Sequence, residues 1–231
     1  MLQTLKFTGD EKTFFASADL HINQTCSSWE NPLWKMRGFD CKEDHARGVK
    51  ESWNATCDEN STCFHLGDIV FEDEHGENFA DILHSLRFKT LYLLLGNHNS
   101  GQGIVYKRIL AEKFPEVFTI GAEVYPLEWE ITEKKKVVFL PQYAEVTINR
   151  NFVVLSHYPM TSHNKMSKKS IHLSGHCHQN LPLTNKDTGR GKRLDVGWDG
   201  WGRPVSFFEI KNHLRGRNID NLDHHGEGIN T

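Results

Sequence analysis

The sequence predicts an α/β fold, and three observations support that class. Short apolar runs recur along the chain, and most of them end at a polar motif. Stretches with apolar residues at helical spacing lie between the earlier runs, as expected when parallel strands are joined by helices. The runs are apolar at successive positions rather than alternating, which is typical of strands covered on both faces.

Five of the apolar runs are expected to be strands that lead directly into polar motifs. They are 13–18 before Asp19, 63–66 before Gly67, 91–95 before Gly96, 152–155 before Ser156 and 171–173 before Gly175. Open α/β sheets build their sites from residues that follow the carboxyl ends of strands. The placement of the motifs therefore predicts a site at those ends.

Three segments between these runs have the spacing of amphipathic helices. They are 42–54, 78–86 and 104–114, and Pro115 ends the third. The second half differs, because its runs are closely spaced, as in an antiparallel meander. These runs are 124–129, 137–140, 145–148 and 152–155, and a further strand is expected over 205–210.

Length and composition favour one soluble domain. The chain of 231 residues predicts a single domain over 1–210 and a loosely ordered polar tail over 211–231. The net charge of −3 argues against a partner such as duplex nucleic acid held by a global positive field. The five cysteines show no CxxC pair, and the chain has no long apolar run, so we expect a reduced, cytoplasmic setting and no membrane partner.

The polar motifs are rich in the side chains that bind divalent metals. They read Asp19-Leu20-His21, Gly67-Asp68, Gly96-Asn97-His98, Ser156-His157 and Gly175-His176-Cys177-His178. Carboxylate, amide oxygen and neutral imidazole suit hard and borderline divalent ions, and two ions need about this many ligands. Any one motif is weak by itself, but five in this order, each at a strand end, indicate a binuclear metal centre.

In these motifs the chain resembles the calcineurin-like metallophosphoesterase family, whose pattern is DxH, GD, GNH, a lone H and GHxH. The resemblance runs from about residue 13 to residue 210, and Arg37-Gly38-Phe39 and Trp53-Asn54 are similar to a compact bacterial and phage-like branch. It implies a four-layer sandwich of two mixed β-sheets flanked by helices.

The resemblance also implies the role of each motif residue. One metal would be bound by Asp19, His21 and His178, the other by Asn97, His157 and His176, with Asp68 bridging both. Manganese is favoured, and iron, zinc, cobalt or nickel also suit mixed oxygen and nitrogen ligands. A hydroxide bridging the two ions would be the nucleophile.

Three residues are expected to contact the substrate. His98 is the candidate proton donor to the leaving group and would contact the phosphate of the substrate, and Asn97 would contact that phosphate as well. Arg37 is a candidate to clamp phosphate oxygens, with a surface position as the equal alternative. Asn99 replaces the acidic residue that usually follows GNH, so we expect a weaker proton donor in His98 and a preference for good leaving groups.

Several other residues have an ordinary structural explanation. We expect His65 to be packed, His163 and His172 to lie at the surface or behind the ligands, and Asp195 and Asp199 to support turns and hydrogen bonds. Trp198 and Trp201 are expected to cap the core, with base stacking as the alternative.

The resulting functional prediction is hydrolysis of phosphate esters, with a phosphodiesterase acting on nucleotides or nucleic-acid ends favoured. Two alternatives remain open from the sequence: a phosphomonoesterase acting on proteins or small molecules, and a metal-bound scaffold without activity.

Overall fold

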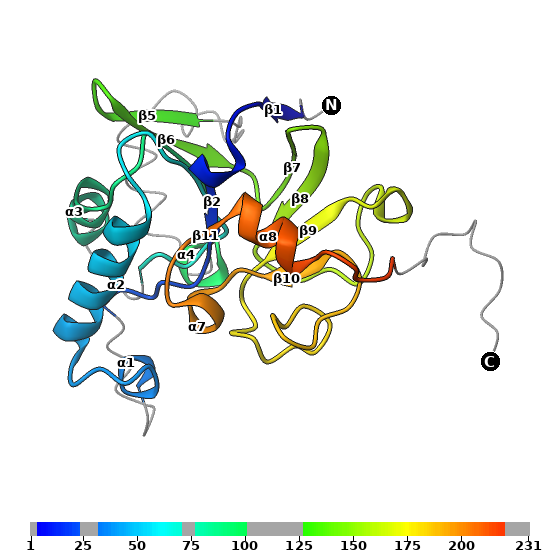
Figure 1. Ribbon diagram of the computed structural model, residues 1–231. Helices are drawn as coiled ribbons and strands as arrows, with labels where there is room; N and C mark the ends of the chain where they lie inside the picture. Colours follow the sequence, from blue (N-terminus) through cyan, green and yellow to red (C-terminus); the bar gives the residue numbers. More distant parts are fainter. Residues whose placement is uncertain (1–3, 24–31, 71–76, 101–126, 220–231) are drawn as a thin grey trace.

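The computed structural model describes residues 4–23, 32–70, 77–100 and 127–219. Figure 1 shows two β-sheets, with helices α2 (Lys42–Thr56) and α3 (Glu77–Ser85) on the outer side of one of them. The fold is therefore α/β, with two mixed sheets flanked by a few helices, as the sequence predicts.

The first sheet contains the strands that lead into the first three motifs. Its order is β11-β2-β3-β4-β6-β5. The central strands β2 (Phe14–Ser17), β3 (Thr62–His65), β4 (Thr90–Leu94) and β6 (Lys135–Leu140) are parallel. The edge strands β11 (Val205–Ser206) and β5 (Leu127–Thr132) are antiparallel to their neighbours.

The second sheet contains the strands that lead into the last two motifs. Its order is β1 (Leu5–Phe7), β7 (Tyr143–Ile148), β8 (Asn151–Ser156), β9 (Ile171–Ser174) and β10 (Arg193–Asp195). All its pairs are parallel except β7 with β8. The short strands β1 and β10 were not expected, because three residues are too few for a recognisable pattern.

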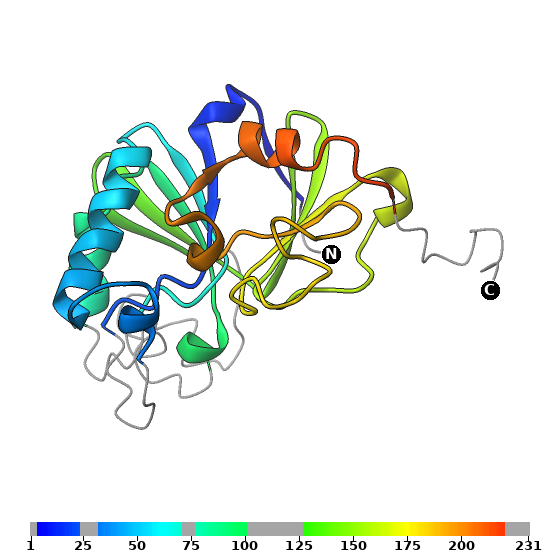
Figure 2. The same ribbon diagram turned by 60° about the horizontal axis from the view of Figure 1, so that its bottom comes forward.

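Two hydrophobic cores explain why the strands of the first sheet are apolar at successive positions. Phe15, Cys63 and Leu91 pack with the apolar residues of α2 and α3. Phe14 and Phe64 point to the other face, where they pack with Val146 and Val153 from the second sheet. In the turned view of Figure 2 the two sheets face each other across this second core.

The two described helix predictions are confirmed to within two residues. In α2, the Cys41 side chain caps the helix by accepting from the Asp44 N–H, and Val49 and Trp53 are buried. In α3, Phe79 and Leu83 are fully buried on one face. The helix expected over 104–114 lies outside the described residues.

The strand expected over 205–210 is mostly wrong. After the two residues of β11, the chain enters helix α8 (Phe207–His213). The reason is a capping box, in which Ser206 and Glu209 exchange hydrogen bonds at the helix start. Because α8 crosses residue 210 and Leu214 is buried, the packed structure extends beyond the predicted domain boundary.

The expected four-strand meander is instead two separate hairpins. β5 and β6 pair in the first sheet, while β7 and β8 pair in the second. The outer face of the second sheet is covered by the segment after His157, where the Met160 N–H donates to His172 and Thr161 accepts from Arg193. Among the described residues, no helix has the length and apolar character needed to cross a membrane.

Candidate metal centre

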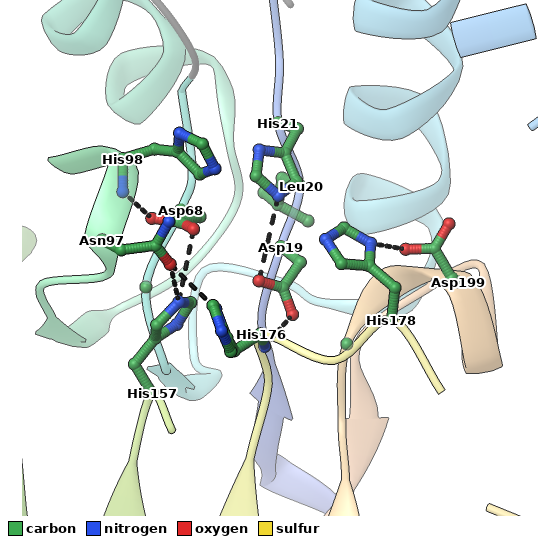
Figure 3. Close-up of polar contacts among 12 residues, drawn as sticks. Asp19, Leu20, His21, Asp68, Asn97, His98, His157, His176, His178 and Asp199 are labelled. Atoms are coloured by element: carbon green, nitrogen blue, oxygen red, sulfur yellow. Dashed lines mark hydrogen bonds and ion pairs between the residues drawn. The ribbon is translucent and has the colours of Figure 1, made fainter. Parts of the chain in front are cut away.

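The loops after five strands bring all seven predicted metal ligands together, as Figure 3 shows. Asp19 and His21 follow β2, Asp68 follows β3, and Asn97 begins the short helix α4 (Asn97–Ser100) after β4. His157 follows β8, and His176 and His178 follow β9. Ligands from both sheets therefore meet at one end of the fold.

Asp19, His21 and His178 form the first triad. Each offers one ligand atom, and these atoms lie within 4.8 Å of one another. The Nε2 atom of His21 is 3.9 Å from Oδ1 of Asp19, and the rings of His21 and His178 are stacked with centroids 5.1 Å apart. This grouping agrees with the first ligand set that the sequence predicts.

Asn97, His157 and His176 form the second triad. The Oδ1 atom of Asn97 lies 2.8 Å from Nε2 of His157 and 2.9 Å from Nδ1 of His176. Three potential ligand atoms thus converge, as the second predicted set requires.

Asp68 lies between the two triads. Its Oδ2 atom is 3.3 Å from Nε2 of His157. The Asp68 carboxylate forms one potential ligand group with Asp19 and His157, and another with His21 and His98. This position suits a carboxylate shared by two ions.

His98 is exposed, and its ring centroid is 5.2 Å from that of His21. Its backbone N–H donates to Oδ1 of Asp68 at 3.1 Å. A ring that reaches the site while facing solvent suits proton transfer. The same ring can also reach a metal held by His21 and Asp68, a role not predicted from the sequence. The side chain of Asn99 lies outside the described residues, so its effect on His98 stays a prediction.

The environment of Asp19 suits a cation. The residue is completely buried, and Oδ1 has no hydrogen-bond partner within the described part of the chain. Burial raises the pKa of Asp19 to about 7, although the charges of His178 and His157 oppose the shift. A buried carboxylate oxygen of this kind is expensive unless a positive charge lies beside it.

The histidine pKa values show how strongly the carboxylates act on the site. Burial lowers the pKa of His157, but its hydrogen bond and charge interaction with Asp68 outweigh that effect and raise it. Burial also lowers the pKa of His178, and Asp199 reverses the direction in the same way. Because a metal needs neutral imidazole, binding at these residues would displace protons.

Five of the seven predicted ligands have a left-handed backbone. The φ angles are 57° for Asp19, 48° for His21, 59° for Asp68, 69° for His176 and 47° for His178. L-residues other than glycine avoid this region, and its concentrated use is typical of functional sites. The loops curl the chain so that successive ligands face inward.

Two glycines make room for this arrangement. A Cβ on Gly96 would lie 2.0 Å from Oδ1 of Asp68. Gly67 has a φ of +112°, and a Cβ there would lie 2.6 Å from the backbone of Gly96. The GD and GNH motifs therefore need their glycines because the two loops are in contact.

The N–H groups of Arg37 are all engaged by other groups of the protein. The residue ends α1 (Leu33–Met36), and its side chain is 5% exposed. Its five N–H groups have five partners: two Asp199 oxygens, the carbonyls of Asp19 and Leu20, and Nε2 of His45. The guanidinium therefore has no donor left for the predicted phosphate clamp, because the site's own groups use them all.

Asp199, in α7 (Trp198–Trp201), lies behind the first triad, as the expectation of a hydrogen-bonding role suggested. Its Oδ2 is 2.6 Å from Nδ1 of His178. Burial raises the pKa of Asp199, but its hydrogen bonds with His178 and Arg37 outweigh this and hold the pKa well below its usual range. Asp195 accepts from the Gly197 and Gln179 N–H groups, so it supports turns.

The tryptophans and the remaining histidines have structural positions. Trp198 is buried in the core beneath α2, and Trp201 packs on the core between the sheets, so the preferred capping explanation is confirmed. His65 is fully buried, as expected. The surface expectation is wrong for His163 and His172. His172 is buried beneath the segment that covers the second sheet, and His163 is a buried residue of that segment whose ring lies against that of His172.

Among the described residues, Tyr158 lies beside the site and was not predicted from the sequence. Its ring lies edge-on to those of His157 and His176, with centroids 5.2 Å and 4.6 Å away, and the residue is 45% exposed. Its only signal in the sequence is that it follows His157. An exposed aromatic ring therefore borders the second triad.

Comparisons with known proteins give relatives but no activity. No family model matches the chain. The Gene 66 protein of Mycobacterium phage L5 is 26% identical over 231 residues, which cover 95% of this chain and 99% of that protein. A crystal structure of a protein of unknown function from Aquifex aeolicus matches with a TM-score of 0.53 at 14% identity, over 86% of this chain and 97% of that one. The second likeness concerns the fold alone.

Proposed function

We propose that the protein is a dimetal phosphoesterase with the sandwich fold of the calcineurin-like metallophosphoesterases, and that phosphodiesters are its preferred substrates. The observation that carries this proposal is the convergence of two ligand triads on Asp68. Two ions that share a carboxylate form the usual arrangement for in-line displacement at phosphorus.

The residues present fit two divalent ions. Asp19, His21 and His178 would hold one ion, and Asn97, His157 and His176 the other, with Asp68 between them. The buried Oδ1 of Asp19 and the space that Gly96 leaves beside Asp68 support this assignment. When bound, the ions would supply an activated water and neutralise charge on the phosphoryl group.

His98 provides the remaining chemistry. The leaving alkoxide needs a proton, and an exposed imidazole beside Asp68 can donate it and then be reprotonated from solvent. We assign phosphate contact to His98 and Asn97, and remove Arg37 from this role because its donors are all used.

Tyr158 supports the preference for diesters. A diester presents a second organic group that a monoester lacks, and an exposed aromatic ring beside the second triad can pack against such a group. A nucleoside would suit this ring. Trp198 and Trp201 are used in packing and do not supply this contact.

The test compares hydrolysis of bis-p-nitrophenyl phosphate and p-nitrophenyl phosphate by the purified chain with added Mn²⁺. We expect the diester to be the better substrate. His98→Ala should lower turnover by about 10²–10⁴-fold, the usual contribution of a general acid, while bound manganese stays at two per chain. Asn99→Asp should move the alkaline limb of the pH–rate profile to higher pH, because a carboxylate beside His98 would keep the proton donor protonated.

His84→Ala is the matched control, because His84 is an exposed histidine on α3. Its turnover should equal that of the wild type. If the chain binds manganese tightly but hydrolyses neither ester with manganese, iron, zinc, cobalt or nickel, the phosphoesterase proposal is rejected and the metal-bound scaffold is favoured. Loss of one manganese ion in His98→Ala would instead make His98 a ligand.

A further inference from the structure

We propose that Arg37 and Asp199 are positioning residues that prepare the first triad, and only that triad, for its metal. The inference rests on the proposed function to the extent that this triad holds a divalent ion. Arg37 ends α1 and Asp199 lies in α7, so two segments far apart in the sequence meet behind the ligands.

Arg37 holds the loop that presents Asp19 and His21. It donates to the carbonyls of Asp19 and Leu20, in both cases at 2.8 Å. These carbonyls belong to the turn whose flanking residues Asp19 and His21 are left-handed, a conformation that needs support from its surroundings. A planar guanidinium can bind both carbonyls and a carboxylate together, whereas an ammonium cannot match that geometry.

Asp199 determines which nitrogen of His178 faces the site. The carboxylate takes Nδ1 at 2.6 Å, so Nε2 is the nitrogen directed toward Asp19 and His21 (Figure 3). Metal-binding histidines usually donate their second N–H to a carboxylate or carbonyl, which fixes the tautomer and the ring. Arg37 in turn fixes Asp199 through two hydrogen bonds of 2.9 Å and 2.8 Å.

His45 completes the environment of Arg37. Burial lowers the pKa of this imidazole to about 4, with a further contribution from the charge of Arg37, so the ring is neutral near pH 7. Its Nε2, 3.0 Å from Arg37, can therefore accept. The guanidinium therefore has a partner on α2 as well as partners in α7 and in the loop of Asp19.

The second triad has a different support. Nδ1 of His157 is 2.8 Å from the carbonyl of Leu66, and Asn97 contacts both histidines directly. Neither Arg37 nor Asp199 has a hydrogen bond to this triad in the described part of the chain. Removing the pair should therefore affect one metal and spare the other.

The experiment measures Mn²⁺ binding to the full chain by isothermal titration calorimetry and electron paramagnetic resonance, without substrate. We expect two ions on the wild type. In Asp199→Asn, which preserves shape, and in Arg37→Lys, which preserves charge, one ion should bind about 10–100-fold more weakly and the other unchanged. The spectrum of the coupled pair should become that of a single ion at manganese concentrations that fill only the stronger site.

Asp44→Asn and Arg47→Lys are the matched controls, because Arg47 and Asp44 form a surface ion pair on α2. Both should bind two ions as the wild type does. Unchanged affinity at both sites in Asp199→Asn, or equal weakening of both, would overturn the inference. If Arg37→Lys lowers the melting temperature of the ligand-free chain, its weaker metal binding could reflect lost stability, and the inference is then judged on Asp199→Asn alone. The readout needs no hydrolysis, so failure of the proposed activity leaves the inference standing.

Discussion

The two triads of the site have the same number of ligands but are held in different ways. The first depends on an ion pair behind it, because Asp199 fixes His178 and Arg37 fixes the turn of Asp19. The second depends on the backbone, since the carbonyl of Leu66 orients His157. Side-chain support can be removed by substitution without changing a ligand, whereas backbone support cannot.

The triads are also linked to each other. The backbone N–H of His176, from the second triad, donates to Oδ2 of Asp19 at 2.8 Å, and Asp68 contacts His157 while grouping with Asp19. Three substitutions test whether the difference between the triads is real, and they are described from the largest expected effect to the smallest.

Asp68→Asn should prevent metal binding at both triads, so that the two no longer differ in affinity. The amide keeps the acceptor for the His98 N–H and tolerates the left-handed backbone, but it removes the shared negative charge. We expect turnover to fall to background and both manganese ions to be lost at micromolar concentration. Metal analysis after gel filtration measures this, and retention of one tightly bound ion would show that Asp68 serves a single triad.

Asp19→Asn should show how much the buried carboxylate of the first triad destabilises the ligand-free protein. The folded pKa of about 7 lies above the unfolded value near 3.8, so Asp19 stabilises the ligand-free protein fully below pH 4 and loses that contribution as the pH rises to about 7. Relative to wild type, the variant should gain stability over this range, by an upper limit on the order of 4 kcal/mol.

Urea unfolding of both proteins in chelator at several pH values measures this gain. Taking the difference between the two proteins removes the contribution of buried histidines that do not interact with Asp19, such as His65 and His172. A difference that stays constant between pH 4 and 7 would mean that Asp19 has the same pKa in the folded and unfolded protein, because positive charge beside the carboxylate offsets its burial.

Asn97→Ala should weaken the second triad alone. Its Oδ1 is the atom that His157 and His176 share, so its loss removes a ligand from one ion. We expect that ion to bind at least 100-fold more weakly, exceeding the typical effect of a residue behind a ligand. Asn164→Ala, at an exposed residue that donates to Glu145, is the control. Weakening of the ion at the first triad would show that the halves are not independent in binding.

The first sheet and the helices beside it were predictable because each element contains its own pattern. β2, β3 and β4 are buried on both faces, and α2 has Val49 and Trp53 at helical spacing. The helix that follows β11 was not predictable from hydrophobicity, since the mostly apolar segment from Val205 to Ile210 suits either a strand or a buried helix. The deciding interaction is local and polar, between Ser206 and Glu209.

The site was predictable as a set of ligands but not as a supported structure. Asp19, Asp68 and the histidines follow strands, so the topology alone brings them together. Arg37 looked like a substrate contact because the sequence gives its charge and not its neighbours. Its five partner atoms come from three separate segments, and only the folded chain shows that they consume every donor.

The left-handed backbone of five ligands has a consequence for engineering. Each such residue costs roughly 1–2 kcal/mol relative to a relaxed conformation, and a whole domain is stable by only roughly 5–15 kcal/mol. Glycine at His21, His176 or His178 would relieve the backbone while deleting a ligand. A redesign that optimised the melting temperature alone would therefore begin its substitutions at these positions and erase the site first.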